Sequence, residues 1–173
     1  MLDNYLFLEV KLCARLKELG VKKRTYFYWI LPDGSGNHKL ASVFQPDENG
    51  SVVLKEYTDI FSLAENEYPA WTAEELIGIM PKRLTIDNKP YCALFIEKNE
   101  WEGHNNAYMC YYLTNSFGVV AKKGSNKLTE KRILAKIMVE SEGRTLVEAI
   151  AKLLIRIIEL GLITADNKKT HFN

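Results

Sequence analysis

The chain has 173 residues, of which 47% are hydrophobic and 26% are charged, and its formal net charge is +1. This length can bury a substantial core, so we expect one globular domain over residues 1–165 and a polar tail at 166–173. The balanced charge indicates neither nucleic acid nor membranes as a partner of the whole chain, and without a recognisable signal peptide we expect a cytoplasmic protein with no membrane contact.

The first part of the sequence predicts one helix followed by antiparallel strands. Apolar residues recur at steps of three and four from Tyr5 to Leu19, and Gly20 supplies a typical helix end. The next segments are aromatic or β-branched and are separated by turn residues, which favours strands joined in hairpins. The predicted elements are a helix at 3–19 and strands at 25–31, 39–44 and 51–58.

The middle of the sequence predicts a short helix, three strands and a second helix. Thr72 and Glu75 form a capping box that opens a helix ending at Met80. Residues 129–140 are assigned to a helix because their apolar residues repeat at three and four, although this run could also pair as a buried strand. The three predicted strands are 90–97, 107–113 and 117–121.

The segment from Thr145 to Leu160 predicts a helix that is apolar on nearly every side. Thr145 and Glu148 form a second capping box, and the only charged residues of the run are Glu148, Lys152, Arg156 and Glu159, in one narrow stripe. A helix of this kind usually lies in the core. We therefore expect an α+β fold in which an antiparallel sheet of about five to six strands packs against this long C-terminal helix and the N-terminal helix.

Few residues indicate catalysis, and the sequence favours a chain that is not an enzyme. His104, which follows Glu100 and Glu102, is the best candidate for a catalytic group, but the spacing matches no metal or hydrolase motif, and a solvated loop is the favoured interpretation. No cofactor and no metal are predicted. Wide spacing and apolar surroundings predict buried free thiols for Cys13, Cys92 and Cys110.

Aromatic and charged residues suggest contact with another protein or with a second copy of the chain. Acids cluster at 56–80 and bases at 122–136, a division that can serve complementary contacts. The strand at 25–31 is apolar on both faces, so it is either covered on both sides, the favoured alternative, or meets a partner. The candidate interaction residues are Tyr28, Trp29, Glu65, Glu67 and Trp101.

The basic cluster offers a nucleic-acid alternative. Its side chains could hold phosphates, and tyrosines on the preceding strand could stack on bases, although a solvated surface is the simpler interpretation. The candidate residues are Lys122, Lys123, Lys127, Lys131, Arg132 and Lys136.

Two segments, Pro69 to Pro81 and Arg144 to Ile163, together resemble short blocks in small uncharacterised proteins of bacterial phages and mobile elements. The resemblance implies an origin in a mobile element and assigns no activity or catalytic residue. The leading hypothesis is a non-enzymatic protein-interaction module. The alternatives are a nucleic-acid-binding accessory protein that uses the basic cluster and an enzyme that uses His104.

Overall fold

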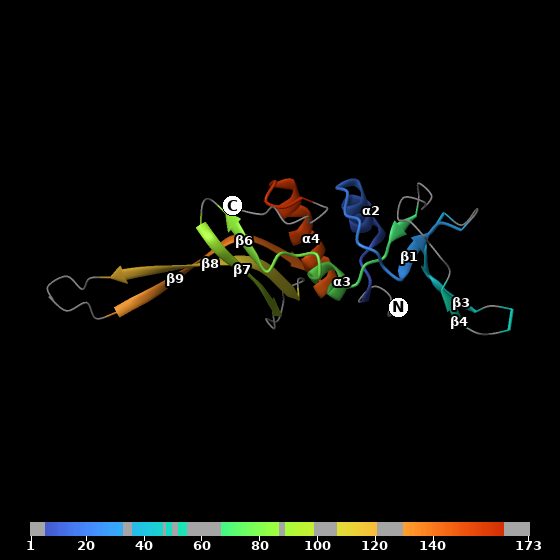
Figure 1. Ribbon diagram of the computed structural model, residues 1–173, viewed down its shortest axis with the longest axis horizontal. Coiled ribbons are helices and arrows are strands. Elements are labelled where there is room, and N and C mark those ends of the chain that lie inside the picture. The colour runs from blue at the N-terminus through green and yellow to red at the C-terminus, as the bar shows by residue number, and fades with distance from the viewer. Residues whose placement is uncertain are drawn as a thin grey trace.

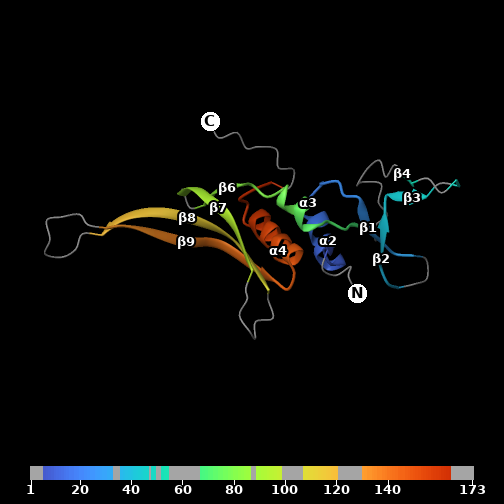
Figure 2. The ribbon, with the colours of Figure 1, turned by 90° about the horizontal axis from the view of Figure 1, so that it is seen from below.

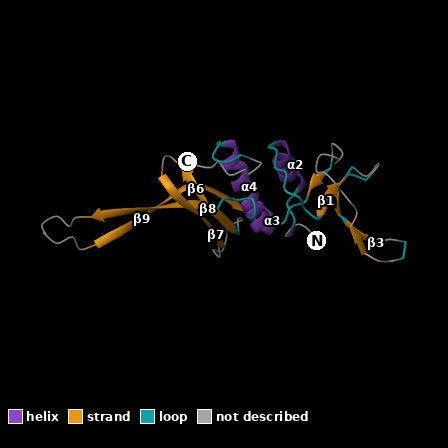
Figure 3. Ribbon diagram, in the orientation of Figure 1, coloured by secondary structure: helices purple, strands orange, loops and turns teal. Residues whose placement is uncertain are grey.

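The computed structural model describes residues 6–32, 36–46, 48–49, 52–54, 67–86, 89–98, 107–120 and 130–164. The molecule is elongated, and its helices lie between a four-stranded sheet on one side and smaller strand pairings on the other (Figure 1). Figure 3 shows the same division by secondary structure. The helices that lie within the described residues are α2 (Val10–Glu18), α3 (Ala73–Ile77) and α4 (Leu146–Glu159).

All strand pairs among the described residues are antiparallel, so the predicted α+β class is confirmed. The strands form three groups rather than the one sheet that the sequence predicted. The first, in the order β2-β1-β5, contains β1 (Phe27–Ile30), β2 (Lys39–Ser42) and β5 (Tyr68–Pro69). The second pairs β3 (Phe44–Pro46) with β4 (Val52–Leu54). The third, in the order β6-β7-β8-β9, contains β6 (Arg83–Ile86), β7 (Lys89–Lys98), β8 (Tyr108–Val120) and β9 (Glu130–Gly143).

Strand β9 corrects the prediction of a helix over residues 129–140. The apolar spacing fits a helix, but the run also contains β-branched residues, and the whole of β9 pairs with β8 through thirteen residue pairs. That long-range pairing decides the outcome, because secondary-structure preference is weak compared with tertiary context. Arg132 and Lys136 therefore lie four positions apart along a strand and do not share a helix face. Strand β8 also joins the two predicted strands at 107–113 and 117–121 into one.

Helix α4 is the centre of the core, as its composition predicted. Its Thr145 cap accepts a hydrogen bond from the backbone N–H of Glu148. The Glu148 carboxylate accepts from the backbone N–H of Arg144, one residue before the cap, rather than from Thr145 itself. The fully or almost fully buried residues of α4 are Val147, Ala149, Ile150, Ala151, Leu153, Leu154 and Ile157.

Two indole groups tie the N-terminal segment to the rest of the core. The fully buried Trp71 donates to the carbonyl of Lys23 at 2.8 Å. Trp29 of β1 donates to the carbonyl of Leu8 at 2.7 Å.

The capping box predicted at α3 is complete, because Thr72 and Glu75 each accept from the other's backbone N–H. In the described part of the chain, no helix is long and apolar enough to cross a membrane.

Candidate functional site

The aromatic strand proposed for protein contact serves the fold in this structure. Tyr28 is only 4% exposed and packs with Val43, and Trp29 is half-buried with its indole nitrogen bonded to Leu8. This is the core placement that the sequence analysis favoured for the strand. Tyr26, just before β1, is the exposed aromatic of this region, with 57% of its surface accessible.

Of the other candidates for protein contact, only Glu67 lies among the described residues. It is half-buried, and its backbone carbonyl accepts a hydrogen bond from Nζ of Lys17 at 2.9 Å. Glu65 and Trp101 lie outside the described residues, as do the tail at 166–173 and the candidate catalytic group His104 with the two glutamates that precede it.

The clearest candidate surface is one face of the four-stranded sheet. The opposite face of this sheet carries residues such as Cys110, Tyr112 and Val139, which pack with α4 in the core. Successive side chains of a strand point to opposite faces, so the candidate surface is turned away from α4. We call it the open face. It consists of Arg83, Ala93, Phe95, Glu97, Met109, Tyr111, Leu113, Ile137, Glu140 and Glu142.

Strand register arranges the open face in three rows. Ala93, Leu113 and Ile137 lie side by side across three strands. Phe95, Tyr111 and Glu140 form the next row, and Glu97, Met109 and Glu142 form the third. An extra residue in β9, between the partners of Tyr112 and Leu113, keeps Ile137 and Glu140 on the same face despite their odd spacing.

Tyr111 lies at the centre of the open face. Its ring stacks on Phe95 with centroids 5.6 Å apart and an interplanar angle of 12°. Its hydroxyl donates to Oε1 of Glu97 at 2.6 Å, and this bond, followed by burial, raises the pKa of Tyr111 to about 12. The ring is therefore neutral and fixed in place over the whole physiological pH range.

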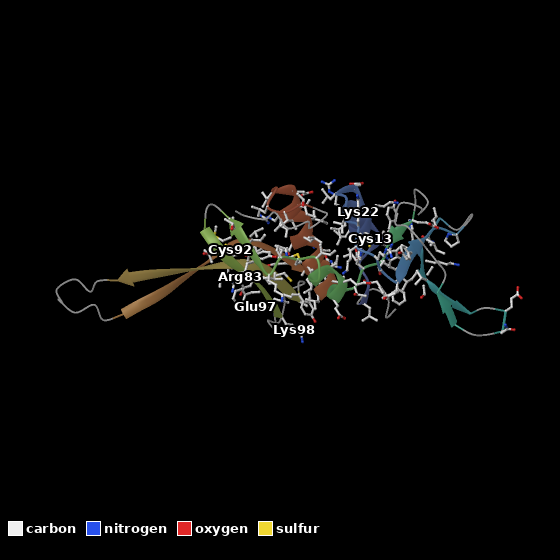
Figure 4. The ribbon with its side chains drawn as sticks, viewed as in Figure 1. Cys13, Lys22, Arg83, Cys92, Glu97 and Lys98 are labelled. Carbon is white, nitrogen blue, oxygen red and sulfur yellow. The ribbon has the colours of Figure 1, made fainter. Side chains whose placement is uncertain are left out.

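The open face combines an apolar centre with an acidic border. Phe95 is 39% exposed and Ile137 is 42% exposed, while Ala93, Met109 and Leu113 are half-buried. Glu97 and Glu142 are exposed in the third row and Glu140 is exposed at the β9 side of the second, while the exposed Arg83 of β6 lies beside Ala93 in the first row. Figure 4 labels Arg83 and Glu97 on this sheet. The described helices lie together at the other side of the sheet (Figure 2).

The basic cluster occupies a different part of the same hairpin. Lys131, Arg132 and Lys136 belong to β9, opposite Val119, Gly118 and Thr114 of β8. Lys122, Lys123 and Lys127 lie outside the described residues. The proposed base-stacking tyrosines of β8 are placed elsewhere, because Tyr112 is buried against α4 and Tyr111 belongs to the open face.

The described residues offer little that resembles an active site. They contain no group of three His, Cys, Asp or Glu residues that could hold a metal ion. The three cysteines are buried thiols outside any disulfide, as predicted, and burial raises the pKa of Cys13 to about 12 and that of Cys110 to about 11. Cys13 and Cys110 are therefore poor nucleophiles at neutral pH.

Comparisons of the chain with protein-family models, with curated proteins and with solved structures find no match.

Proposed function

We propose that this chain is a non-enzymatic protein-interaction module that binds its partner through the open face. The observation that carries the proposal is the exposed Phe95, stacked on the 7% exposed Tyr111 and on the same sheet face as the exposed Ile137, a face turned away from α4. An antiparallel sheet with one face in water normally places polar residues there. Aromatic and aliphatic residues at the centre of such a face are typical of contact surfaces.

The exposed apolar area gives the surface a useful binding energy. An aromatic side chain buries roughly 150–250 Å² when fully covered, so covering the exposed 39% of Phe95 removes about 80 Å² from water. At roughly 25 cal/mol per Å² this contributes about 2 kcal/mol. Tyr111 adds little new burial, but its bond to Glu97 holds Phe95 in position, which lowers the ordering cost on binding.

The acidic border defines the chemistry of the partner. Three exposed glutamates border the apolar centre along its third row and its β9 side, so a complementary partner presents aromatic or aliphatic side chains flanked by Lys or Arg. We therefore propose a basic, amphipathic segment of another protein as the occupant. Association of two copies through this face is the alternative outcome that the experiment must separate.

The experiment compares two matched variants. Phe95→Ser combined with Ile137→Ser removes the apolar centre at two positions that already tolerate water, and Leu160→Ser changes a 59% exposed residue just after α4 as the control. A partner captured from the source cells is identified, purified and titrated against each variant. We expect binding at least tenfold weaker for the double variant, a loss of about 1.4 kcal/mol, and unchanged binding for Leu160→Ser.

Charge and stoichiometry complete the test. Glu140→Lys with Glu142→Lys should slow association and reduce its dependence on salt, because rim charges act mainly on the encounter rate. Light scattering of the purified wild type reports the oligomeric state. A concentration-dependent dimer that the Phe95 and Ile137 changes dissolve would assign the face to a second copy. A partner that binds the double variant as tightly as the wild type would refute the proposal.

A further inference from the structure

The hairpin of β8 and β9 extends well beyond the sheet to which it belongs. The described pairing of β7 with β8 ends at Ala93 and Leu113, yet β8 and β9 continue through seven more residue pairs, from Thr114–Lys136 to Val120–Glu130. We call residues 114–120 and 130–136 the ribbon. Figures 1 and 2 show it projecting away from the helices in both views.

We infer that the ribbon binds duplex nucleic acid through its phosphate backbone, a function separate from protein binding by the open face. Seven residues of strand span about 23 Å at roughly 3.3 Å per residue. A two-stranded ribbon on its own is only marginally stable in water, so a ribbon of this length gains stability from a partner. The major groove of B-DNA is about 12 Å wide and admits a two-stranded ribbon.

Charge points to the same partner. The β9 half of the ribbon has three bases, Lys131, Arg132 and Lys136, and one acid, Glu130, while residues 114–120 carry no charged side chain. The ribbon therefore has a net charge of +2, which exceeds the +1 of the whole chain. Positive charge concentrated on a projecting element favours phosphates over apolar or cationic partners. Three bases on one strand are enough for a modest, salt-sensitive affinity.

The test is a fluorescence anisotropy titration of a labelled 24-base-pair DNA duplex. The ribbon variant carries Lys131→Glu, Arg132→Glu and Lys136→Glu. A matched control carries the same charge change at three exposed lysines of the body, at positions Lys11, Lys82 and Lys98. Thermal unfolding of all three proteins checks that each remains folded.

We expect the wild type to bind with a slope of log K against log salt of about −2.7, since each phosphate contact contributes roughly −0.9. Its affinity should then fall about 40-fold between 50 and 200 mM salt. The ribbon variant should lose binding at 50 mM salt, and the control should retain it. The Phe95→Ser and Ile137→Ser variant should bind the duplex like the wild type, which separates this inference from the proposed protein contact.

Four results would overturn the inference: no binding of the wild type at 50 mM salt, equal loss in the ribbon and control variants, tighter binding of a 24-nucleotide single strand than of the duplex, or equally effective competition by poly-glutamate. The last result would assign the ribbon to an acidic protein instead.

Discussion

Gly143 ends β9 at the point where the chain turns into α4, and replacing it with Ala should destabilise the fold by a steric mechanism. A Cβ at this position would overlap the backbone nitrogen of Ala149, and it would lie 3.0 Å from Ala149 Cα and from the carbonyl carbon of Glu148. These are backbone atoms of the first turns of α4, so relief requires the helix to move away from the sheet.

The magnitude follows from three contributions. Extra volume in a well-packed site costs typically 1–3 kcal/mol. Displacement of α4 also weakens the hydrogen bond from Oγ of Ser141 to the carbonyl of Ala149, which measures 2.6 Å, and costs about 1 kcal/mol more. Restriction of the unfolded chain by Ala offsets roughly 0.4–1 kcal/mol. The clash dominates, and we expect a net loss of about 2–3 kcal/mol, or roughly 4–12 °C in Tm.

Urea unfolding followed by circular dichroism measures the effect, and Gly161→Ala provides the control. Gly161 has a φ of +69° with no atom within 4 Å of an added Cβ, so Ala there meets only the left-handed backbone cost of about 1–2 kcal/mol. Gly143→Ala should lose more than Gly161→Ala. Wild-type stability for Gly143→Ala would refute the packing of α4 against the end of β9.

Three further outcomes are expected. Tyr112→Phe should cost about 1–3 kcal/mol in urea unfolding, because it removes a 2.6 Å hydrogen bond to the carbonyl of Pro81 and leaves that acceptor unpaired; Tyr111→Phe, whose partner is exposed, should cost clearly less, and equal losses would contradict this account. Partial burial raises the pKa of Glu148, but the ion pair with Lys152, one turn later, and the bond from the backbone N–H of Arg144 lower that pKa overall below 4.5. The ionised Glu148 carboxylate therefore stabilises the fold fully above pH 4.5, and this stabilisation disappears as the pH falls through the folded-state pKa. In unfolding curves measured from pH 6 to pH 2, Glu148→Gln should reduce the loss of the free energy of unfolding at acid pH. Burial raises the pKa of Cys13 to about 12, so a thiol reagent at pH 8 should label the native chain slowly and all three cysteines promptly in denaturant; rapid native labelling would show that the core opens.

Local signals in the sequence predicted α3 and α4 well, whereas the helix predicted at 3–19 is wrong in its first part, because Phe7 forms a β-bridge with Thr72 and α2 begins only at Val10. The charged stripe of α4 and the threonine caps at 72 and 145 depend on residues only a few positions apart, so they can be recognised in a single sequence. The periodicity at 129–140 failed because Ile133 and Ile137 satisfy both a helix and a strand, and only the distant β8 decides between them. Pairing over such separations leaves little trace in a single sequence.

The open face was missed for a related reason. The run from Tyr91 to Ile96 is apolar at every position, which indicates a strand with two apolar faces, as the run around Tyr28 and Trp29 does. At Tyr28 and Trp29 both faces of the strand are covered by other residues of the protein, whereas the face that carries Phe95 is partly exposed to water. Composition shows that both faces of a strand are apolar, but register and neighbouring elements determine which of them meets water.

The charged stripe of α4 also protects the protein against its own edge strand. β9 is the last strand of its sheet, and its carbonyl groups at Glu140 and Glu142 accept hydrogen bonds from Arg156 at 3.3 Å and from Lys152 at 3.2 Å. A free edge with such acceptors is a template on which another chain can add a strand and begin to aggregate. Lys152 and Arg156 of α4 therefore also block the addition of another strand at this part of the sheet. Loss of these two side chains should first lower the concentration at which the protein stays in solution.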